Sequence, residues 1–193
     1  IAAPSANKFG RVSPTTAAHV HSEFGDDLLI LDGGPCEVGI ESTIVDCTRG
    51  EPVLLRPGLL TPQQLEAACA VTVRVPSKPD AHAPRASGTL ASHYAPNAQV
   101  RLMRLPDMQQ ALQQLETTQP STSPPLMVWT RTPLAIASGL SKRVRRVEMP
   151  SDPVACAHAL FAQLRAFDEA GVSEIWVEQP PNLPAWAGVL DRL

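Results

Sequence analysis

The sequence predicts an α/β protein in which a Pro-rich linker joins two units. Within residues 1–74, two short apolar runs lie on either side of a polar turn, which is the pattern of an antiparallel hairpin. Residues 75–98 contain four prolines, few aliphatic side chains and no helical period, as is typical of an interdomain linker. Residues 99–193 alternate strand-like and helix-like segments, so they predict a small, Rossmann-like, doubly wound α/β domain.

Two helices of the first unit are predicted from the residues that would start them. Ser13, followed by a proline, predicts a helix over 14–24 with the serine as its N-cap. Thr61, also followed by a proline and with Gln64 at the capping-box position, predicts a second helix over 61–68.

The second unit is expected to follow the order strand, helix, strand, strand, helix, strand. Elements of this length in this order are typical of a doubly wound α/β unit. The strands are expected at 99–105, 126–130, 143–148 and 174–178, and the helices at 107–116 and 152–170.

The two ends of the hairpin place polar side chains side by side. Ser42 and Thr43 lie where one strand begins, and Arg56 lies where its partner strand ends. Because these ends are adjacent in an antiparallel pair, the two hydroxyls and the guanidinium are expected to point into one pocket.

The segment 3–14 is too interrupted by small residues and prolines to form a helix or a strand. Ser5, Asn7 and Ser13 are short polar side chains, and two cations, Lys8 and an arginine three residues later, lie among them. Such a loop is suited to a nucleotide or another polyanion. A surface turn of the same composition is the alternative.

Overall composition narrows the classes of protein that this chain can represent. The net charge is −3 and aromatic residues make up 4% of the 193 residues, which argues against a general nucleic-acid-binding surface. The four cysteines are widely spaced and are interpreted as reduced, mostly buried thiols of a cytoplasmic protein. The apolar runs are too short to span a membrane, so no membrane contact is expected.

Several short motifs occur in a fixed order along the chain and together resemble one family. They are PSAN at 4–7, LDGG at 31–34, GIESTIVD at 39–46, LLRPG at 54–58, SGTLASHYAP at 87–96 and LFAQLRAFD at 160–168. In this order and at these spacings they resemble threonylcarbamoyl-AMP synthase, of the YrdC-like domain family, in its two-domain form. Each motif is weak by itself, but the ordered combination is specific and covers nearly the whole chain.

The resemblance implies a fold and an activity. The fold would be part of a YrdC-like α/β domain with a twisted, mostly antiparallel sheet (1–74), a linker (75–98) and a small α/β domain (99–193). The activity would be the joining of L-threonine, bicarbonate and ATP, with Mg²⁺, into threonylcarbamoyl-adenylate and pyrophosphate. The product would go to the machinery that transfers the threonylcarbamoyl group to tRNA.

The resemblance also implies roles for eight residues at the matching motif positions. ATP contacts would come from Ser5, Asn7, Ser13, Arg56 and Tyr94, and contacts to threonine from Ala3, Ser42 and Thr43. No catalytic base and no residue that binds a metal directly is assigned. Tyr94, in the linker, is interpreted either as part of a lid over the nucleotide or as an anchor of the linker on the domain surface.

The chain departs from the family pattern at both ends. Family members carry a long segment with a Lys-x-Arg motif ahead of the PSAN loop, whereas this sequence starts at Ile1 and stops at Leu193. It is therefore expected to be an internal piece that lacks the N-terminal half of the YrdC-like domain and the extreme C-terminus. Such a piece is expected to be inactive by itself.

Three further interpretations remain open. A YrdC-like RNA-binding or regulatory module without synthase activity would use the basic cluster 142–146, although a solvated strand face is the favoured interpretation of that cluster. A carbamoyl-transfer factor would require CxxC pairs, which are absent from the sequence. The carboxylates Asp32, Glu37, Glu41 and Asp46 are interpreted as solvated side chains, with a magnesium site as the alternative.

Overall fold

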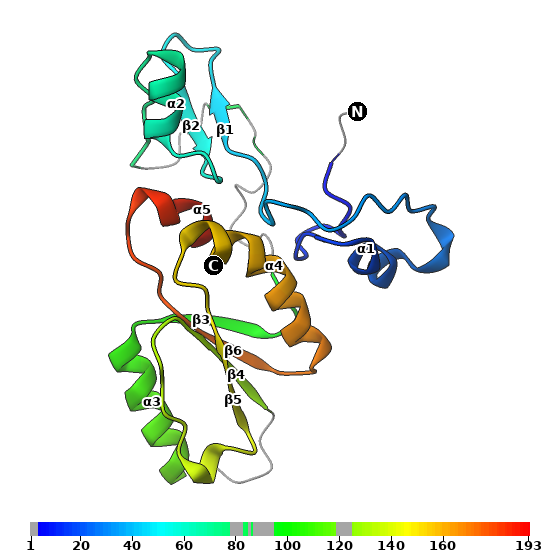
Figure 1. The fold of residues 1–193 in the computed structure, drawn as a ribbon, viewed down its shortest axis with the longest axis vertical. Helices are drawn as coiled ribbons and strands as arrows, with labels where there is room; N and C mark the ends of the chain where they lie inside the picture. Colours follow the sequence, from blue (N-terminus) through cyan, green and yellow to red (C-terminus); the bar gives the residue numbers. More distant parts are fainter. Residues whose placement is uncertain (1–3, 78–82, 85, 87–94, 119–124) are drawn as a thin grey trace.

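A computed structural model describes residues 4–77, 83, 84, 86, 95–118 and 125–193. It contains a two-stranded antiparallel sheet in the first unit and a four-stranded parallel sheet in the second (Figure 1). The predicted α/β class with two types of sheet is therefore confirmed. Ala3 and Tyr94, which carry two of the expected binding roles, lie outside the described residues.

The hairpin of the first unit forms as its sequence pattern predicts. Strand β1 (Ile44–Asp46) pairs antiparallel with β2 (Val53–Arg56), and Ile44 lies opposite Arg56. Helix α2 (Pro62–Cys69) follows, and its N-terminus carries the expected capping box between Thr61 and Gln64.

The first helix begins later than the sequence predicts. Helix α1 (Ala17–Phe24) has Thr16, not Ser13, as its N-cap, and the Thr16 hydroxyl accepts a hydrogen bond from the His19 N–H. The Ser13 hydroxyl instead donates to a carboxylate far along the chain, Glu41. A tertiary hydrogen bond has replaced the local cap, so the prediction for Ser13 as N-cap was wrong.

Four parallel strands form the sheet of the second unit, in the order β3-β6-β4-β5. Their bounds follow the sequence closely, although the first strand ends two residues early. They are β3 (Gln99–Met103), β4 (Leu126–Thr130), β5 (Val144–Glu148) and β6 (Glu174–Glu178). A short 3₁₀ helix, η2 (Ser138–Leu140), lies in the connection between β4 and β5.

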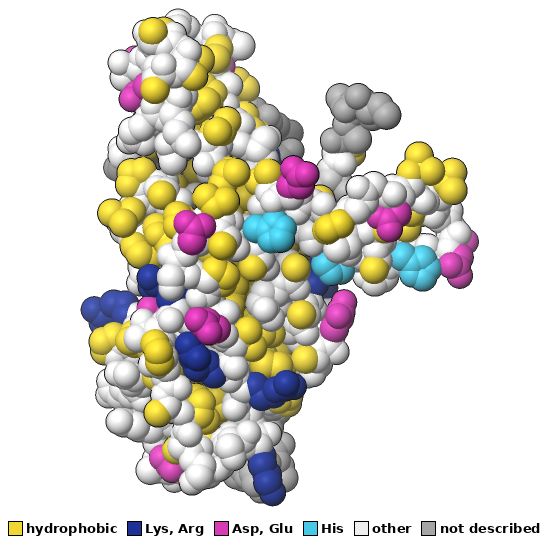
Figure 2. All heavy atoms as spheres, in the orientation of Figure 1, with side chains coloured by type: hydrophobic (Ala, Val, Ile, Leu, Met, Phe, Trp, Pro, Cys, Tyr) yellow, Lys and Arg dark blue, Asp and Glu magenta, His cyan; other side chains and the backbone are white. Residues whose placement is uncertain are grey.

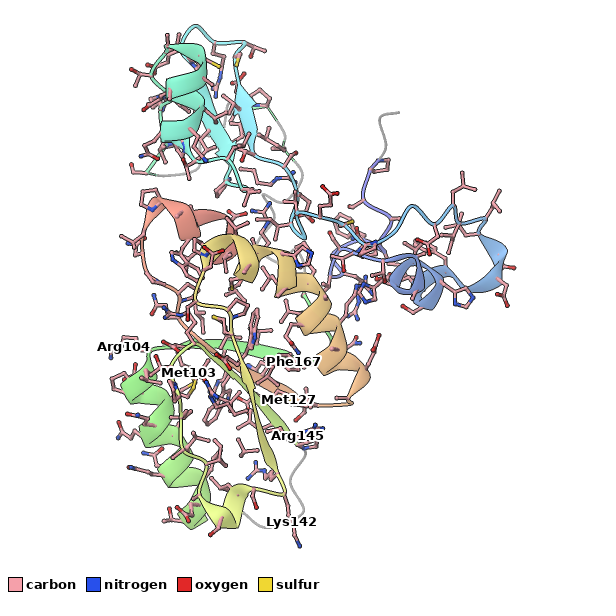
Figure 3. The ribbon with its side chains drawn as sticks, viewed as in Figure 1. Met103, Arg104, Met127, Lys142, Arg145 and Phe167 are labelled. Atoms are coloured by element: carbon pink, nitrogen blue, oxygen red, sulfur yellow. The ribbon has the colours of Figure 1, made fainter. Side chains whose placement is uncertain are left out.

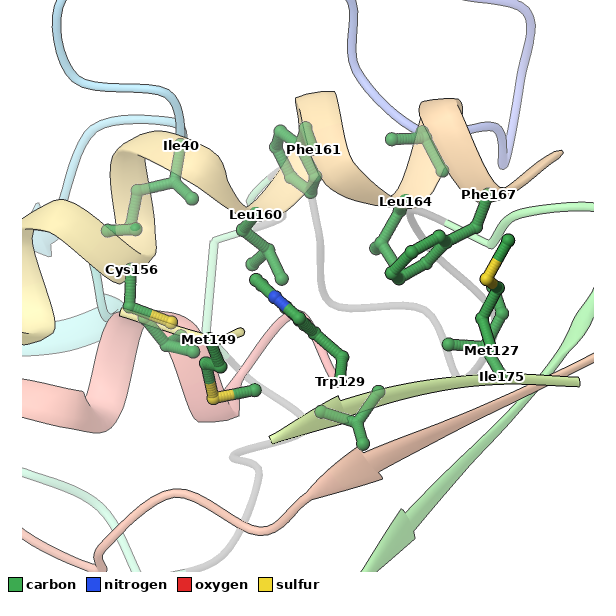
Figure 4. Packing of buried hydrophobic residues seen from close by; sticks show 14 of the residues in the cluster. Ile40, Met127, Trp129, Met149, Cys156, Leu160, Phe161, Leu164, Phe167 and Ile175 are labelled. Atoms are coloured by element: carbon green, nitrogen blue, oxygen red, sulfur yellow. The ribbon is translucent and has the colours of Figure 1, made fainter. Parts of the chain in front are cut away.

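Helices cover both faces of this sheet, so its strands bury side chains on both sides. Helix α4 (Pro153–Glu169) packs on one face with the short helix α5 (Ala187–Leu190) (Figures 1 and 4). Helix α3 (Leu105–Thr118) packs on the other face (Figure 1). Successive strand residues alternate between the two layers: Met127, Trp129, Ile175 and Val177 lie in the α4 layer, and Leu126, Val128 and Trp176 in the α3 layer.

The first unit packs directly on α4 and on the short helix α5 (Ala187–Leu190), which follows the 3₁₀ turn η3 (Pro184–Trp186). Ile40 belongs to the same buried cluster as the α4 side chains (Figure 4). Gly188 lies so close to the first unit that a Cβ there would be 2.7 Å from the Gly58 oxygen and 2.9 Å from Ile40 Cδ1. This interface requires close backbone contact, which only glycine permits.

The chain after α1 projects from the rest of the molecule and carries apolar side chains on its surface (Figures 1 and 2). It begins with the 3₁₀ turn η1 (Gly25–Asp27), and the side chains of Leu29 and Leu31 beyond it are 86% and 88% exposed. Exposed leucines this close together mark a surface suited to contact with other apolar groups.

The cysteines are all free thiols, but their burial differs from the sequence prediction. Cys36, Cys47 and Cys69 are exposed, and Cys156 is buried in the α4 layer. Among the described helices, none is long and apolar enough to cross a membrane.

Candidate functional site

The open end of the hairpin brings Arg56 and Ser42 together, as predicted. The Arg56 side chain is buried, and its Nε and Nη2 donate hydrogen bonds of 3.1 and 2.9 Å to the Ser42 main-chain oxygen. The Ser42 hydroxyl lies 3.5 Å from Nη2. The guanidinium is therefore held against the segment before β1 by the backbone, at a fixed position.

Thr43, the second hydroxyl expected in this pocket, is used to fix the turn. Its Oγ1 donates to the Leu60 main-chain oxygen over 2.9 Å. A Cβ at Gly58 would collide with the Thr43 main-chain nitrogen, so the two segments lie backbone to backbone here. The hydroxyl thus fixes the loop that leads into α2.

The N-terminal loop is organised around the Asn7 side chain. Asn7 Nδ2 donates to the main-chain oxygens of Lys8 at 2.9 Å and Arg11 at 3.2 Å. Its Oδ1 is buried and has no hydrogen-bond partner within the described part of the chain. A buried acceptor without a partner is costly, so this oxygen is well suited to a donor from a ligand. Ser5, in the same loop, is exposed.

Lys8 and Arg11 connect this loop to α1 and α4. The Lys8 main-chain N–H donates to Glu23 Oε2 at 3.0 Å, and the Arg11 side chain pairs with Asp168, with 3.4 Å between Nη2 and Oδ2. Asp168 also accepts hydrogen bonds from the N–H groups of Asn97, at 2.7 Å, and Ala98, at 3.0 Å. One carboxylate on α4 therefore joins the N-terminal loop to the end of the predicted linker.

The residue that follows Tyr94 also lies beside this loop. The Ala95 N–H donates to the Gly10 oxygen over 3.0 Å, and Ala95 forms an isolated parallel bridge with Arg11. The described end of the predicted linker is therefore paired with the loop that carries three of the expected ATP contacts.

Arg165 of α4 fixes the other side of the same segment. Its guanidinium donates to the main-chain oxygens of Val12 and Ser13, the second at 3.4 Å, and forms a 2.5 Å ion pair with Glu23. Burial by itself would raise the pKa of Glu23. Hydrogen bonds from the Lys8 N–H and Arg165 outweigh this effect and lower the pKa below its usual value.

Glu41 connects the two halves of the expected site. Its Oε1 accepts the Ser13 hydroxyl at 2.5 Å, and its Oε2 lies 3.2 Å from Nε of Arg192. Because Glu41 directly precedes Ser42, this carboxylate brings an expected ATP contact and an expected threonine contact onto adjoining segments. The Arg192 side chain is fully buried.

Arg192 is itself held by several main-chain oxygens. Nη1 donates to Pro57 O and, at 3.1 Å, to Gly188 O, and Nη2 donates to Glu41 O at 3.4 Å. Burial raises the pKa of the neighbouring Asp191, although Arg192 and Arg56 both oppose this shift.

Sequence reasoning missed the four residues that hold the site together: Glu41, Arg165, Asp168 and Arg192. Glu41, Arg165 and Asp168 lie inside the motifs at 39–46 and 160–168, and this position was the feature of the sequence that could have indicated their importance. The interpretation of Glu41 and Asp46 as solvated carboxylates was wrong, because both pair with arginines. Asp32 and Glu37 are exposed, as expected.

A metal site is not supported by the side chains present. Within the described ranges, no group of three or more histidine, cysteine, aspartate or glutamate side chains is arranged to hold a metal ion. The alternative interpretation of the four carboxylates as a magnesium site is therefore not supported. Asp46 in particular is used by the Thr48 hydroxyl and by Arg49.

Polar contacts join the segments that carry Ser13 and Glu41 to Arg165 of α4 and to Arg192. Comparison with known families gives matches over both parts of the chain. Residues 60–193 match the family described as "Threonylcarbamoyl-AMP synthase, C-terminal domain". Residues 1–58 match a second family, described as "Telomere recombination". The chain therefore belongs to the threonylcarbamoyl-AMP synthase family.

Comparison with individual relatives shows what fraction of their length this chain covers. It is 34% identical over 196 aligned positions to threonylcarbamoyl-AMP synthase of Bacillus subtilis, covering 100% of this chain and 56% of that protein. It is 41% identical over 109 positions to the Pyrococcus abyssi enzyme of the same name, covering 55% of this chain and 32% of that protein.

The fold of the chain is also similar to that of a solved structure. P. abyssi Sua5 in complex with L-threonine is similar with a TM-score of 0.78 and 28% identity, covering 98% of this chain and 55% of that chain. The present chain thus spans about half the length of the B. subtilis relative and of this structure.

Proposed function

We propose that the complete protein to which this chain belongs is a threonylcarbamoyl-AMP synthase. It would convert L-threonine, bicarbonate and ATP into threonylcarbamoyl-adenylate, pyrophosphate and water. The proposal is supported by the family membership and by the similarity to a structure that contains L-threonine. The observation that carries it is the junction at Glu41, which joins the segment with Ser13 to the segment with Ser42 beside Arg56.

The chemistry explains why such a junction is useful. A carbamate is unstable in water, and its carboxylate must reach the α-phosphate of ATP before it decomposes. The protein therefore has to hold the threonine and the nucleotide next to each other and exclude water. Adjoining loops fixed by buried arginines meet the first requirement, because they leave little freedom in the relative positions of the two binding segments.

Within this proposal, the expected residue roles are retained. Ser5, Asn7 and Ser13 would contact ATP, and Arg56 and Tyr94 would hold the nucleotide. Ala3 and Ser42 would border the threonine, with Thr43 beside it, although the Thr43 hydroxyl already donates to the Leu60 main-chain oxygen. Mg²⁺ would arrive bound to the triphosphate, since the described carboxylates offer it no cluster of ligands. The product would pass to the enzyme system that transfers the threonylcarbamoyl group to tRNA.

The RNA-binding alternative loses support in the structure. Arg146 of the basic cluster donates to the Thr130 hydroxyl and to the Thr130 and Thr132 main-chain oxygens. Its guanidinium is therefore used in hydrogen bonds within the protein. Lys142 and Arg145 remain exposed near the edge strand β5 (Figure 3). Few exposed cations at one sheet edge provide little of the phosphate neutralisation that RNA binding requires.

The test is an assay on the complete gene product. We expect pyrophosphate release that depends on both threonine and bicarbonate. Pyrophosphate release at the same rate without threonine would contradict the proposal. Arg56→Ala should weaken ATP binding by about 1.5–3 kcal/mol, the contribution of a charged hydrogen bond. Arg56→Lys should restore only part of the lost ATP affinity, because lysine lacks the planar set of donors of the guanidinium. Arg104→Ala, which removes an exposed arginine of the second unit, is the matched control.

A further inference from the structure

The hydroxyl of Ser13 has one proton. The direction of its O–H bond is fixed by Glu41, which accepts the hydrogen bond. Glu41 Oε1 lies 2.5 Å from Ser13 Oγ, and an ionised carboxylate can only accept a hydrogen bond. The Ser13 proton therefore points at Glu41, and the rest of this buried oxygen carries lone pairs alone. The other carboxylate oxygen of Glu41, Oε2, lies 3.2 Å from Nε of the fully buried Arg192, so both oxygens of this carboxylate have partners.

The side chain of Asn7 also has its donors occupied by the protein and an acceptor left over. Both protons of its Nδ2 have main-chain acceptors, in Lys8 and Arg11, and its buried Oδ1 has no partner among the described residues. Thus two side chains that are expected to contact the nucleotide have their donors occupied by the protein. Each has an acceptor left for a ligand.

We propose that Glu41, held by Arg192, is a positioning residue that makes Ser13 a hydrogen-bond acceptor toward the bound nucleotide. Ser13 then binds a donor of the ligand, such as an amino or hydroxyl group, or a cation carried by it. It does not bind an unprotonated phosphate oxygen, which is itself an acceptor. The phosphates are left to cationic side chains and main-chain N–H groups. This inference rests on the proposed function, because it takes Ser13 as an ATP contact.

The side chain of Arg192 comes from the C-terminal end of the chain, 151 residues beyond Glu41. The second domain thereby determines the orientation of a hydroxyl in the first. Glu41→Gln tests this directly, because the amide has nearly the same shape but offers Ser13 a donor as well as an acceptor and weakens the link to Arg192.

The experiment measures ATP affinity by calorimetry in the complete gene product, with Ser13→Ala, Glu41→Gln and the double variant. We expect each single variant to weaken ATP binding by about tenfold or more. The double variant should bind no more weakly than Ser13→Ala, because Glu41 acts only through the serine. Glu178→Gln, which changes another buried carboxylate paired with an arginine, should leave ATP affinity unchanged.

Each result distinguishes the inference from the proposed function. If Ser13→Ala binds ATP normally, Ser13 is not in the nucleotide site and that part of the proposed function fails. If Ser13→Ala weakens binding but Glu41→Gln does not, or if their effects add, the positioning role is overturned while the nucleotide site stands. A drop in melting temperature for Glu41→Gln with unchanged ATP affinity would likewise show that the residue is only structural. Arg192→Lys, which keeps the charge, should fall between wild type and Glu41→Gln in affinity.

Discussion

Arg165 in α4 and Glu23 in α1 form an ion pair, with 2.5 Å between Nη2 and Oε1. The two side chains are only 11% and 9% exposed, and the same guanidinium also donates to the main chain at Val12 and Ser13. A single residue of the second unit therefore fixes both the helix α1 and the N-terminal loop of the first unit. A largely buried pair of this kind is sensitive to the loss of one partner, because the remaining charge is only partly solvated.

Removing the cation of this pair should destabilise the protein strongly. Arg165→Met leaves Glu23 buried and unpaired, and we expect a loss of about 3–5 kcal/mol in the free energy of unfolding, measured in urea. The double variant Arg165→Met with Glu23→Leu should recover a substantial part of that loss. Equal stability of wild type and Arg165→Met would show that the pair does not hold the domains together.

Gly188 should tolerate no side chain. In Gly188→Ala the new Cβ would lie 2.7 Å from the Gly58 oxygen, so α5 or the loop after β2 must shift. We expect a loss of about 1–3 kcal/mol in unfolding free energy. Gly139→Ala is the matched control, since its Cβ would be 3.7 Å from the nearest atom, Glu116 Oε1. If both variants lose the same stability, close contact at Gly188 is not the cause.

Asp46 should contribute to stability at neutral pH and lose this contribution in acid. Hydrogen bonds from the Thr48 hydroxyl and N–H, and the contact with Arg49, lower the pKa of Asp46 to about 2. A carboxyl group with a lowered folded-state pKa stabilises the fold above its unfolded pKa, and the effect is lost as the pH falls toward the folded value. The stability difference between wild type and Asp46→Asn should therefore shrink between about pH 4 and pH 2. A difference independent of pH would exclude this role of the charge.

The four cysteines should divide into two reactivity classes. Cys36, Cys47 and Cys69 are exposed, whereas burial raises the pKa of the Cys156 thiol to about 12, despite the opposing effect of Arg131. Iodoacetamide should modify three thiols in the native protein and the fourth only after denaturation, as counted by intact mass. Rapid native modification of Cys156, identified by peptide mapping, would contradict its burial between α4 and the sheet.

The local elements of this protein could be predicted because their signals are short in sequence. The capping box of Thr61 and Gln64 and the strands at 126–130 and 174–178 appear where the sequence places them. The same holds for Arg56 beside Ser42, because the register of a hairpin fixes which ends are neighbours. The binding roles of all eight residues remain predictions: Ser5, Asn7, Ser13, Arg56 and Tyr94 for ATP, and Ala3, Ser42 and Thr43 for threonine.

The tertiary structure decided which partner each polar side chain received. Ser13 had the sequence of an N-cap, yet its hydroxyl is used by Glu41, 28 residues away, and Thr16 caps the helix instead. Glu41 had the sequence of a solvated loop carboxylate, yet the folded chain brings the fully buried Arg192 against it. By itself the sequence determined the α/β class, the hairpin and the capping of α2, because those depend on residues a few positions apart. Only the folded chain determined the contacts between the domains, because a buried charge takes its partner from whatever the packing brings within a few ångströms, at any distance along the sequence.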